Sequence, residues 1–387
     1  MRILKVVAAF DPARYGGPNE VVKASARGLI HVGHSVEVWT SNLITPKEKM
    51  GCSTITTSDH GFSVTYFNSI VNYRWFSICP EMILAAVRRV KQFDCVHIYG
   101  YRDFFSLMLS TVCRLQHVPY MIQPMGSAVT IARNISAKRL FDVVLGHRLL
   151  EGAAVVIAKS EMEATFFRSM KLLRPLNIAQ VPNGFDLSDL TTNVQAGCFR
   201  KRWNIADGAT VFLFMGRLHA MKGVDFLIEA YEYADISNSN LVIVGWEDDN
   251  SAKDLRVMAK RSRVANQIRF IGPLFGHDKF EALKDADVMV ASPIWENYGL
   301  SVLEALGWGV PVLCTNTLGL ASEIDHKGAM VVRRDVEAMA EGMITLARDL
   351  PLRRKMAEMA SKTAQGFNWD LTVNKLEELY NKIRRSK

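Results

Sequence analysis

Short apolar runs alternate with amphipathic segments of helical length along the whole chain. The first run, Ile3–Phe10, predicts a buried strand, and Pro18–Ile30 predicts a helix with its apolar side chains on one side. Pro18 suits the first turn, where an amide hydrogen has no helical partner. Further strands are predicted at residues 36–40, 64–67, 95–98, 120–123, 153–157 and 178–181. This alternation is typical of a parallel sheet covered by helices.

A second series of the same kind begins near residue 211. The turn-rich stretch Val181–Leu187 ends the first series, and the polar segment Thr191–Gly208 leads into the second. A helix with a buried face is predicted over Trp369–Ile383. Strands are predicted at residues 211–215, 241–244, 268–271, 288–291, 310–314 and 330–332.

The length of 387 residues is too great for one ordinary hydrophobic core and fits two domains. The pattern therefore predicts an α/β protein of two doubly wound Rossmann-like domains facing a cleft. We place the first domain at 1–186 and the second at 187–366. The closing helix, 367–387, is expected to pack back toward the first domain.

Composition predicts a folded cytoplasmic protein. Apolar residues make up 49% and charged residues 22% of the chain, which permits a packed core. No apolar run approaches the roughly 20 residues of a membrane-spanning helix, and the amino-terminal stretch lacks a signal-peptide pattern. The 6 cysteines form no C-x-x-C pair, so we expect them to be reduced and structural, with no metal cluster.

The formal charge of +8 favours anionic partners, which are nucleotide phosphates, a lipid surface or a nucleic acid. No basic tract is interleaved with aromatic residues, so nucleic acid ranks last and is not expected as a partner. The basic amphipathic stretch Arg133–Arg148 predicts peripheral contact with a membrane. Alternatively, this stretch is a solvated helix face.

Three segments that follow predicted strands carry candidate chemistry, because ligands of open parallel sheets bind beyond the carboxyl ends of the strands. The first contains Gly16 and Gly17 and leads into a helix. Glycines let backbone amides approach a phosphate, and a helix amino terminus adds partial positive charge. Alternatively, the pair forms only a tight turn. The chain has no dinucleotide fingerprint and no P-loop motif.

The second segment follows the first strand of the second half and contains Arg217 and Lys222. Two cationic side chains five positions apart can both point at one diphosphate. Alternatively, they are two solvated charges at the end of a strand.

The third segment, from Ser292 to Pro311, is the most specific. Glu296 lies in a predicted loop, Gly299 opens a predicted helix, and Glu304 lies inside that helix. A carboxylate in such apolar surroundings needs hydrogen-bond donors, which the two hydroxyls of a ribose would supply. Alternatively, Glu304 pairs with a lysine.

These motifs resemble those of retaining glycosyltransferase family 4, the large group with the GT-B fold that contains sucrose synthase and many bacterial polysaccharide enzymes. The resemblance rests on Gly-Arg-Leu-x-x-x-Lys-Gly from residue 216, then Glu296, Glu304 and the following Ala-Leu-x-x-Gly-x-Pro-Val. It extends more loosely to Gly16-Gly17, the Val-Pro-Asn-Gly-Phe-Asp junction, Gly245-Trp246 and the closing helix.

The resemblance implies a hexosyltransferase of polysaccharide or glycolipid biosynthesis that uses a UDP- or GDP-sugar and a saccharide or lipid-linked saccharide acceptor. Arg217, Lys222 and Glu296 would be catalytic: the two cations hold the diphosphate, and Glu296 binds hydroxyls of the transferred sugar. Glu304 would bind the ribose. The remaining donor-binding residues implied are Gly16, Gly17, Gly245, Pro273, Leu274, Asn297, Tyr298, Gly299 and Leu300, with Pro273 and Leu274 near the base.

One position departs from the family pattern. Many members carry a histidine after the fifth strand, where this chain reads Gln123-Pro124-Met125-Gly126. His97 fits another family position, on the acceptor or sugar side. Alternatively, it is a core histidine.

The implied mechanism is same-face attack, in which the departing phosphate oxygen takes the acceptor proton. Such a reaction needs charge stabilisation more than acid–base groups. Asp285-Ala-Asp287 precedes a predicted strand, whereas metal-binding pairs follow one, so no metal and no cofactor are expected. Two alternatives stay open: a sugar-nucleotide epimerase or phosphorylase of the same fold, and a non-catalytic binding module. The base, the sugar and the acceptor are not identified by the sequence.

Overall fold

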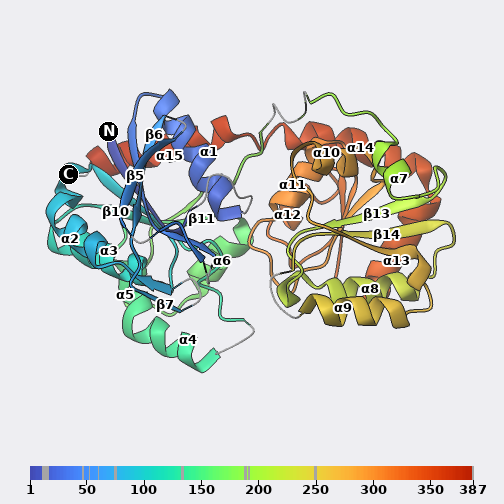
Figure 1. Cartoon of the computed structure of the whole chain (residues 1–387), viewed down its shortest axis with the longest axis horizontal. Coiled ribbons are helices and arrows are strands. Elements are labelled where there is room, and N and C mark those ends of the chain that lie inside the picture. The colour runs from blue at the N-terminus through green and yellow to red at the C-terminus, as the bar shows by residue number, and fades with distance from the viewer. Residues whose placement is uncertain are drawn as a thin grey trace. The chain divides into compact units, whose positions relative to one another are not determined.

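A computed structural model gives the fold of the chain. It describes residues 1–10, 17–45, 48–51, 53–59, 61–73, 76–131, 135–186, 190, 192–247 and 251–385. The chain forms two compact units (Figure 1). The first unit comprises Met1–Asn183 together with Trp369–Lys387, and the second comprises Gly184–Asn368.

The first unit is built on an eight-stranded sheet with the order β12-β11-β10-β9-β1-β2-β6-β5. Its neighbouring strands are parallel except β5 and β6, which are antiparallel. The strands are β1 (Arg2–Ala9), β2 (Ser35–Ser41), β5 (Ile55–Asp59), β6 (Phe62–Phe67), β9 (Cys95–Tyr99), β10 (Tyr120–Gln123), β11 (Val155–Ala158) and β12 (Ile178–Gln180). Two small hairpins add β3 (Leu43–Thr45) with β4 (Glu48–Lys49), and β7 (Val71–Tyr73) with β8 (Phe76–Ile78).

Helices cover both faces of the first sheet, and a separate apolar core fills each face. The closing helix α15 (Trp369–Arg385) shares one face with α1 (Gly17–His31). These two helices are so close that a Cβ atom at Gly28 would lie 2.2 Å from Val373. The other helices of this unit are α2 (Pro80–Arg89), α3 (Phe104–Leu115), α4 (Ile135–Phe141), α5 (His147–Glu151) and α6 (Glu161–Ser169), and a π-helical turn at Asp142–Gly146 joins α4 to α5.

The second unit is built on a six-stranded, wholly parallel sheet with the order β15-β14-β13-β16-β17-β18. The strands are β13 (Thr210–Met215), β14 (Ser239–Val244), β15 (Ile268–Gly272), β16 (Val288–Ala291), β17 (Val312–Thr315) and β18 (Ala329–Val332). The helices are α7 (Cys198–Arg202), α8 (Val224–Ala234), α9 (Ser251–Arg261), α10 (Gly276–Asp285), α11 (Leu300–Gly307), α12 (Ala321–Ile324), α13 (Val336–Arg348) and α14 (Leu350–Ala364).

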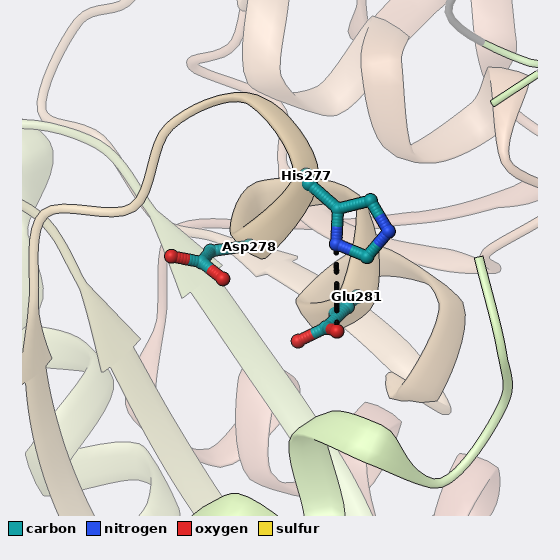
Figure 2. Close-up of side chains that lie close together, drawn as sticks. All are labelled: His277, Asp278 and Glu281. Carbon is teal, nitrogen blue, oxygen red and sulfur yellow. Dashed lines mark ion pairs between the residues drawn. The ribbon is translucent and has the colours of Figure 1, made fainter. Parts of the chain in front are cut away.

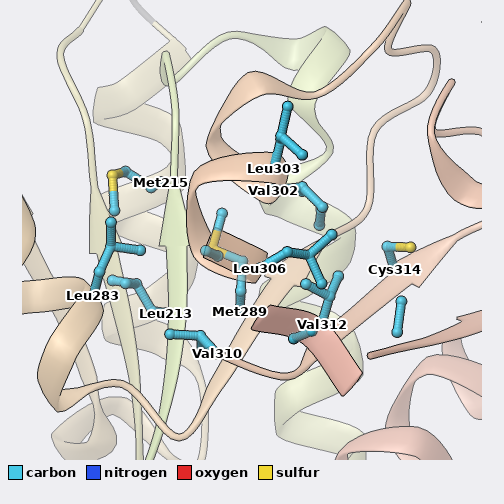
Figure 3. Packing of buried hydrophobic residues seen from close by; sticks show 14 of the residues in the cluster. Leu213, Met215, Leu283, Met289, Val302, Leu303, Leu306, Val310, Val312 and Cys314 are labelled. Carbon is cyan, nitrogen blue, oxygen red and sulfur yellow. The ribbon is translucent and has the colours of Figure 1, made fainter. Parts of the chain in front are cut away.

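Two cores also fill the second unit, one on each side of its sheet. The core beneath α11 brings Val302, Leu303 and Leu306 of that helix against Leu213 and Val312 of the strands (Figure 3). Because these side chains are buried, α11 has little freedom to turn or slide. The core on the opposite face joins α8, α9 and α13. A parallel sheet buried on both faces explains why its strands read as continuous apolar runs.

Every strand expected from an apolar run is present, and the α/β fold with two parallel sheets is confirmed. The sequence analysis did not predict β3, β4, β5, β7 and β8, which are short, and β5 is an edge strand with mostly polar residues. The cysteines that the structure describes are all free thiols. Within the described residues, none of the helices has both the length and the apolar character needed to cross a membrane.

Candidate donor site of the second unit

The predicted donor residues gather at the switch point of the second sheet. β13 lies between β14 and β16 in the sheet. From β13 the chain runs outward through β14 and β15 on one side, then returns to β16 and runs outward through β17 and β18 on the other side. In doubly wound sheets, ligands bind beyond the carboxyl ends of the strands at such a point. Arg217 and Lys222 follow β13, and Glu296 and Gly299 follow β16. The structure therefore brings the second and third motifs together.

The loop after β13 is held by backbone hydrogen bonds to the loop after β14. The amide of Gly216 donates to the carbonyl of Val244 at 3.0 Å, and the amide of Leu218 donates to that of Trp246 at 3.0 Å. Arg217 lies between these anchors and is exposed. The guanidinium is therefore carried on a fixed backbone at the carboxyl edge of the sheet.

Two further contacts join the loops after β13 and β16. The amide of Ile294 donates to the carbonyl of Met221 at 2.9 Å, and the hydroxyl of Ser292 donates to the carbonyl of Gly223 at 2.9 Å. Gly223 adopts a left-handed conformation with φ 65°, and a Cβ atom there would lie 2.1 Å from the carbonyl oxygen of Ser292. Only glycine fits this turn, which fixes Lys222 directly before it.

Lys222 and Glu296 form an ion pair in which the ammonium donates to Oε2 of the carboxylate. Their side chains are 27% and 21% exposed, so both groups are within reach of a ligand. Burial alone would raise the pKa of Glu296. The charge and hydrogen bond of Lys222, the amide of Tyr298 and the charge of Arg217 outweigh that effect and hold the pKa below its ordinary value. Glu296 is therefore ionised at neutral pH and accepts hydrogen bonds.

Helix α11 begins beside this ion pair. Gly299 caps the helix in a left-handed conformation with φ 103°, where a Cβ atom would lie 2.6 Å from Leu318. Tyr298 is buried, and its carbonyl accepts the amide of Leu320 at 3.2 Å. A small pocket is lined by side chains that include Lys222, Glu296 and Ser301. The helix amino terminus adds partial positive charge at this pocket.

Glu304 pairs with a lysine that the sequence analysis missed. The ammonium of Lys279, on α10, donates to Oε1 of Glu304 at 3.2 Å. The side chain of Glu304 is 29% exposed, so the pairing leaves part of the carboxylate accessible. This geometry matches the lysine alternative stated for Glu304. No spacing rule in the sequence connects these two helices.

The loops after β14 and β15 lie beside the Arg217 loop. The amide of Gly245 donates to the carbonyl of Gly272 at 2.9 Å, and a Cβ atom at Gly245 would lie 1.8 Å from the carbonyl oxygen of Gly216. Pro273 is exposed and Leu274 half-buried. The rings of Trp246 and Phe275 stack at 6.1 Å between centroids. The sequence analysis did not identify this aromatic pair, although each residue lies within a few positions of the end of a predicted strand.

Three predicted residues belong to the first unit. Gly16 lies outside the described residues, and Gly17 is the first residue of α1 in the first unit. His97 is fully buried in β9. A hydrogen bond of 2.8 Å links its Nδ1 to the hydroxyl of Tyr380 on α15, and its ring stacks on Tyr99 at 4.2 Å. His97 thus occupies the core position that was its alternative interpretation.

One cluster of the described residues has groups that can bind a metal ion, and it lies on α10 (Figure 2). Nδ1 of His277 is 3.4 Å from Oε1 of Glu281. Arg202 of α7, however, makes contacts of 2.8 Å with both Asp278 and Glu281. Because the guanidinium already compensates these carboxylates, the arrangement favours an ion-pair network between two helices over a metal site.

Asp285 and Asp287 form the helix-to-strand connection that their position predicts. Oδ1 of Asp285 accepts the amide of Gly197 at 2.6 Å, and Asp287 pairs with Arg200 at 2.7 Å. These carboxylates fix α7 against the sheet.

Comparison with known families agrees with this geometry. Residues 198–363 match the sequence model described as "Glycosyl transferases group 1", and residues 16–184 match "Glycosyl transferase 4-like domain". The two matches together span most of the chain, which belongs to the GT4-type glycosyltransferases with the GT-B fold.

Curated relatives carry glycosyltransferase names. The D-inositol 3-phosphate glycosyltransferase of Jonesia denitrificans is 26% identical over 249 residues, which are 61% of this chain and 59% of that protein. This chain therefore aligns with little more than half the length of that relative. An uncharacterized glycosyltransferase of Methanocaldococcus jannaschii is 22% identical over 98% of both chains.

Solved structures share the fold over the whole chain. Sucrose-phosphate synthase from Thermosynechococcus elongatus superposes with a TM-score of 0.79 at 20% identity and covers 100% of both chains. HepE of Anabaena, in complex with UDP and glucose, superposes with a TM-score of 0.78 at 16% identity over 99% of this chain and 100% of that chain.

Proposed function

We propose that this chain transfers a hexosyl unit from a UDP- or GDP-sugar to a saccharide or lipid-linked saccharide acceptor, with retention of configuration and without a metal ion. The observation that carries the proposal is the ion pair of Lys222 and Glu296 beside Arg217, at the switch point of the second sheet. Two cations, a helix amino terminus and an ionised carboxylate at one edge suit a diphosphate bonded to a sugar.

In the proposed complex, Arg217 and Lys222 bind the diphosphate, and Glu296 accepts hydrogen bonds from hydroxyls of the transferred sugar. The low pKa of Glu296 supports this role, because an ionised carboxylate accepts stronger hydrogen bonds than a neutral one. Glu304 accepts from the ribose while the hydrogen bond from Lys279 holds its carboxylate in place. Pro273 and Leu274 lie toward the base, close to the stacked rings of Trp246 and Phe275.

The proposed chemical step breaks the bond between the anomeric carbon and the diphosphate oxygen, and forms a bond from the same face to the acceptor oxygen. The acceptor proton passes to the departing phosphate oxygen. Negative charge grows on the diphosphate as its bond breaks, and Lys222, Arg217 and the amino terminus of α11 stabilise it. This stabilisation replaces the charge that a bound metal supplies in metal-dependent transferases.

The names of related proteins support the substrate class. HepE was solved with UDP and glucose, and an Escherichia coli relative that is 26% identical over 216 residues is named as a galactosyltransferase that uses UDP-Gal. Both bind uridine nucleotides, so we rank UDP-sugars first among the donors.

Thermal denaturation with a panel of UDP, GDP and ADP sugars tests the donor assignment. A ligand that binds only the folded state raises the unfolding midpoint, so we expect one nucleotide series to raise it and the others not to. The product formed with that donor is then examined by NMR for the configuration at the anomeric carbon. An inverted product contradicts same-face attack, and an isomerised free sugar nucleotide favours the epimerase alternative.

A further inference from the structure

The helical segment from α4 to α5 in the first unit exposes a row of large apolar side chains. Five of the exposed large apolar residues of the described chain fall within eleven positions: Ile135, Leu140, Val143, Val144 and Leu145. Leu140 and Val143 are 67% and 68% exposed. A helix on the surface of a globular protein normally turns its apolar side chains inward. This row, which we call the apolar ridge, has its apolar side chains turned outward instead.

The π-helical turn at the centre of the segment presents the apolar ridge. Asp142 and Gly146, at the two ends of the turn, are buried, and the three apolar residues between them are exposed. A Cβ atom at Gly146 would lie 2.2 Å from the hydroxyl of Tyr101, so this side of the turn lies directly against the body of the unit. Turns of this kind recur at functional sites.

A charged network holds the turn in place. Nε of Arg102 donates to Oδ1 of Asp142 at 2.9 Å, and Nη2 donates to Oδ2 at 2.6 Å. The same guanidinium donates to the carbonyl of Ala128 at 2.9 Å and to the hydroxyl of Thr130 at 2.8 Å. Asp142 is the one carboxylate between Ile135 and Arg148, and Arg102 compensates its charge. The apolar ridge is therefore carried on a fixed helix.

The exposed charged groups beside the apolar ridge are cationic. Arg139 and Arg148 are exposed, and Lys138 is half-buried with its ammonium donating to the carbonyl of Ile131 at 2.9 Å. A second copy of this chain related by twofold symmetry would set these arginines against one another. Aliphatic side chains also offer no stacking platform for nucleic-acid bases. An anionic surface with an apolar interior satisfies both features.

We propose that the apolar ridge inserts into an anionic lipid bilayer, while Arg139 and Arg148 bind lipid phosphates. Helices with aliphatic and basic side chains lie at the boundary between headgroups and acyl chains in this way. The contact goes beyond the proposed transfer reaction, since it requires neither donor nor acceptor. It would bring the first unit to the surface on which a lipid-linked acceptor resides.

Co-sedimentation of the full chain with vesicles tests the proposal. We expect the protein to sediment with phosphatidylglycerol vesicles at low salt and to stay in solution with phosphatidylcholine vesicles. Replacing Val143→Ser and Val144→Ser together should reduce the bound fraction roughly tenfold, because apolar area no longer leaves water. Val257→Ser, at an exposed valine on α9, serves as the control and should bind like the wild type. Unchanged thermal midpoints show that the variants are folded.

A solvatochromic label separates insertion from simple charge attraction. Attached to Val144→Cys, the label should shift its emission to the blue on phosphatidylglycerol vesicles, whereas a label on Val257→Cys should not. The proposal is overturned if the protein ignores these vesicles at low salt, or if the paired serine variant binds them as well as the wild type. A concentration-dependent dimer that the serine variant abolishes would instead assign the apolar ridge to a second copy. None of these outcomes depends on donor binding.

Discussion

The two units share a helix-covered parallel sheet, but their central strands place charged groups in different surroundings. In the second unit, Lys222 and Glu296 lie beyond the strand ends, partly exposed and paired with each other. In the first unit, Lys5 and His97 lie inside β1 and β9 and are fully buried, and Lys159 follows β11 with 2% of its surface exposed. One architecture thus supports partly exposed, paired charges at the candidate site of one unit and a polar core in the other.

Burial disfavours the charged form of the groups in both regions, but only in the second unit do neighbouring groups outweigh it. Burial lowers the pKa of Lys159 to about 7, and the nearby Glu163 opposes this only in part. Burial also holds the pKa of Lys5 well below its ordinary value, while its ammonium nitrogen donates to Ser25 at 2.6 Å and Tyr99 at 2.8 Å. In the second unit, Lys222 instead outweighs the burial of Glu296 and keeps that carboxylate charged. Partial exposure and pairing preserve a charge that complete burial suppresses.

The largest expected effect is the loss of transfer on replacing Lys222→Met. Removing one preorganised charge from a site of developing negative charge costs about 10²–10³ in rate. Steady-state assays of nucleoside diphosphate release measure this loss of rate. Lys260→Met, at an exposed lysine of α9, controls for the loss of positive charge alone. If Lys222→Met and the control are equally active, Lys222 has no catalytic role.

The lowered pKa of the buried Lys159 should make the stability of the first unit depend on pH. Because the pKa is about 7 in the folded chain and 10.5 is the ordinary value, the unfolded chain binds more protons between these values. Stability should therefore rise with pH in that window, by about 1.4 kcal/mol per pH unit at most. Lys159→Met should reduce this slope, and Lys5, whose pKa is also lowered by burial, accounts for the part that remains.

Urea denaturation of the wild type and Lys159→Met at several pH values between neutrality and pH 10 provides the measurement. Lys253→Met, at an exposed lysine, is the matched control and should leave the slope as it is. If Lys159→Met keeps the full slope of the wild type, Lys159 does not contribute to it.

A smaller loss of stability is expected from Tyr380→Phe. The tyrosine hydroxyl shares a buried hydrogen bond of 2.8 Å with His97, and its removal leaves a buried polar group without that partner. A cost of about 1–3 kcal/mol in unfolding free energy follows. Nucleotide binding in the second unit should be unchanged. A variant that loses nucleotide affinity but no stability would contradict a purely structural role for this pair.

Chelators should not change the rate of transfer. The proposed reaction uses Arg217 and Lys222 in place of a metal, so transfer should continue in EDTA at the untreated rate. Complete loss of transfer, restored by added manganese or magnesium, would overturn the metal-independent mechanism.

The sequence predicted every strand of both sheets except the edge strand β5, because each predicted strand is an apolar run that a local pattern reveals. The resemblance implied the grouping of the second and third motifs. Strands β13 and β16 are continuous apolar runs, and the motif residues directly follow them. The neighbouring positions of these two strands in the sheet bring Lys222 to Glu296. A resemblance to a known family supplied the roles of these residues, which periodicity alone does not contain.

Other features depend on contacts that no local pattern encodes. Lys279 approaches Glu304 only because α10 and α11 lie on the same face of the sheet. The strand pattern around His97 is the same for a site residue and for a core residue. Its buried surroundings depend on Tyr380, which is far away in the chain. Lys5 within an apolar strand was a visible signal of a buried charge that the sequence analysis did not use.

Calorimetry with free nucleoside diphosphate tests the central assignment, which gives the ribose to Glu304 and the sugar to Glu296. The diphosphate contains the ribose but not the sugar. We therefore expect Glu304→Gln to weaken binding by about 1.5–3 kcal/mol, as for a hydrogen bond to a charged group. Glu296→Gln should leave this affinity nearly unchanged while it depresses transfer. Equal weakening by both variants, or weakening by Glu296→Gln alone, would contradict the account.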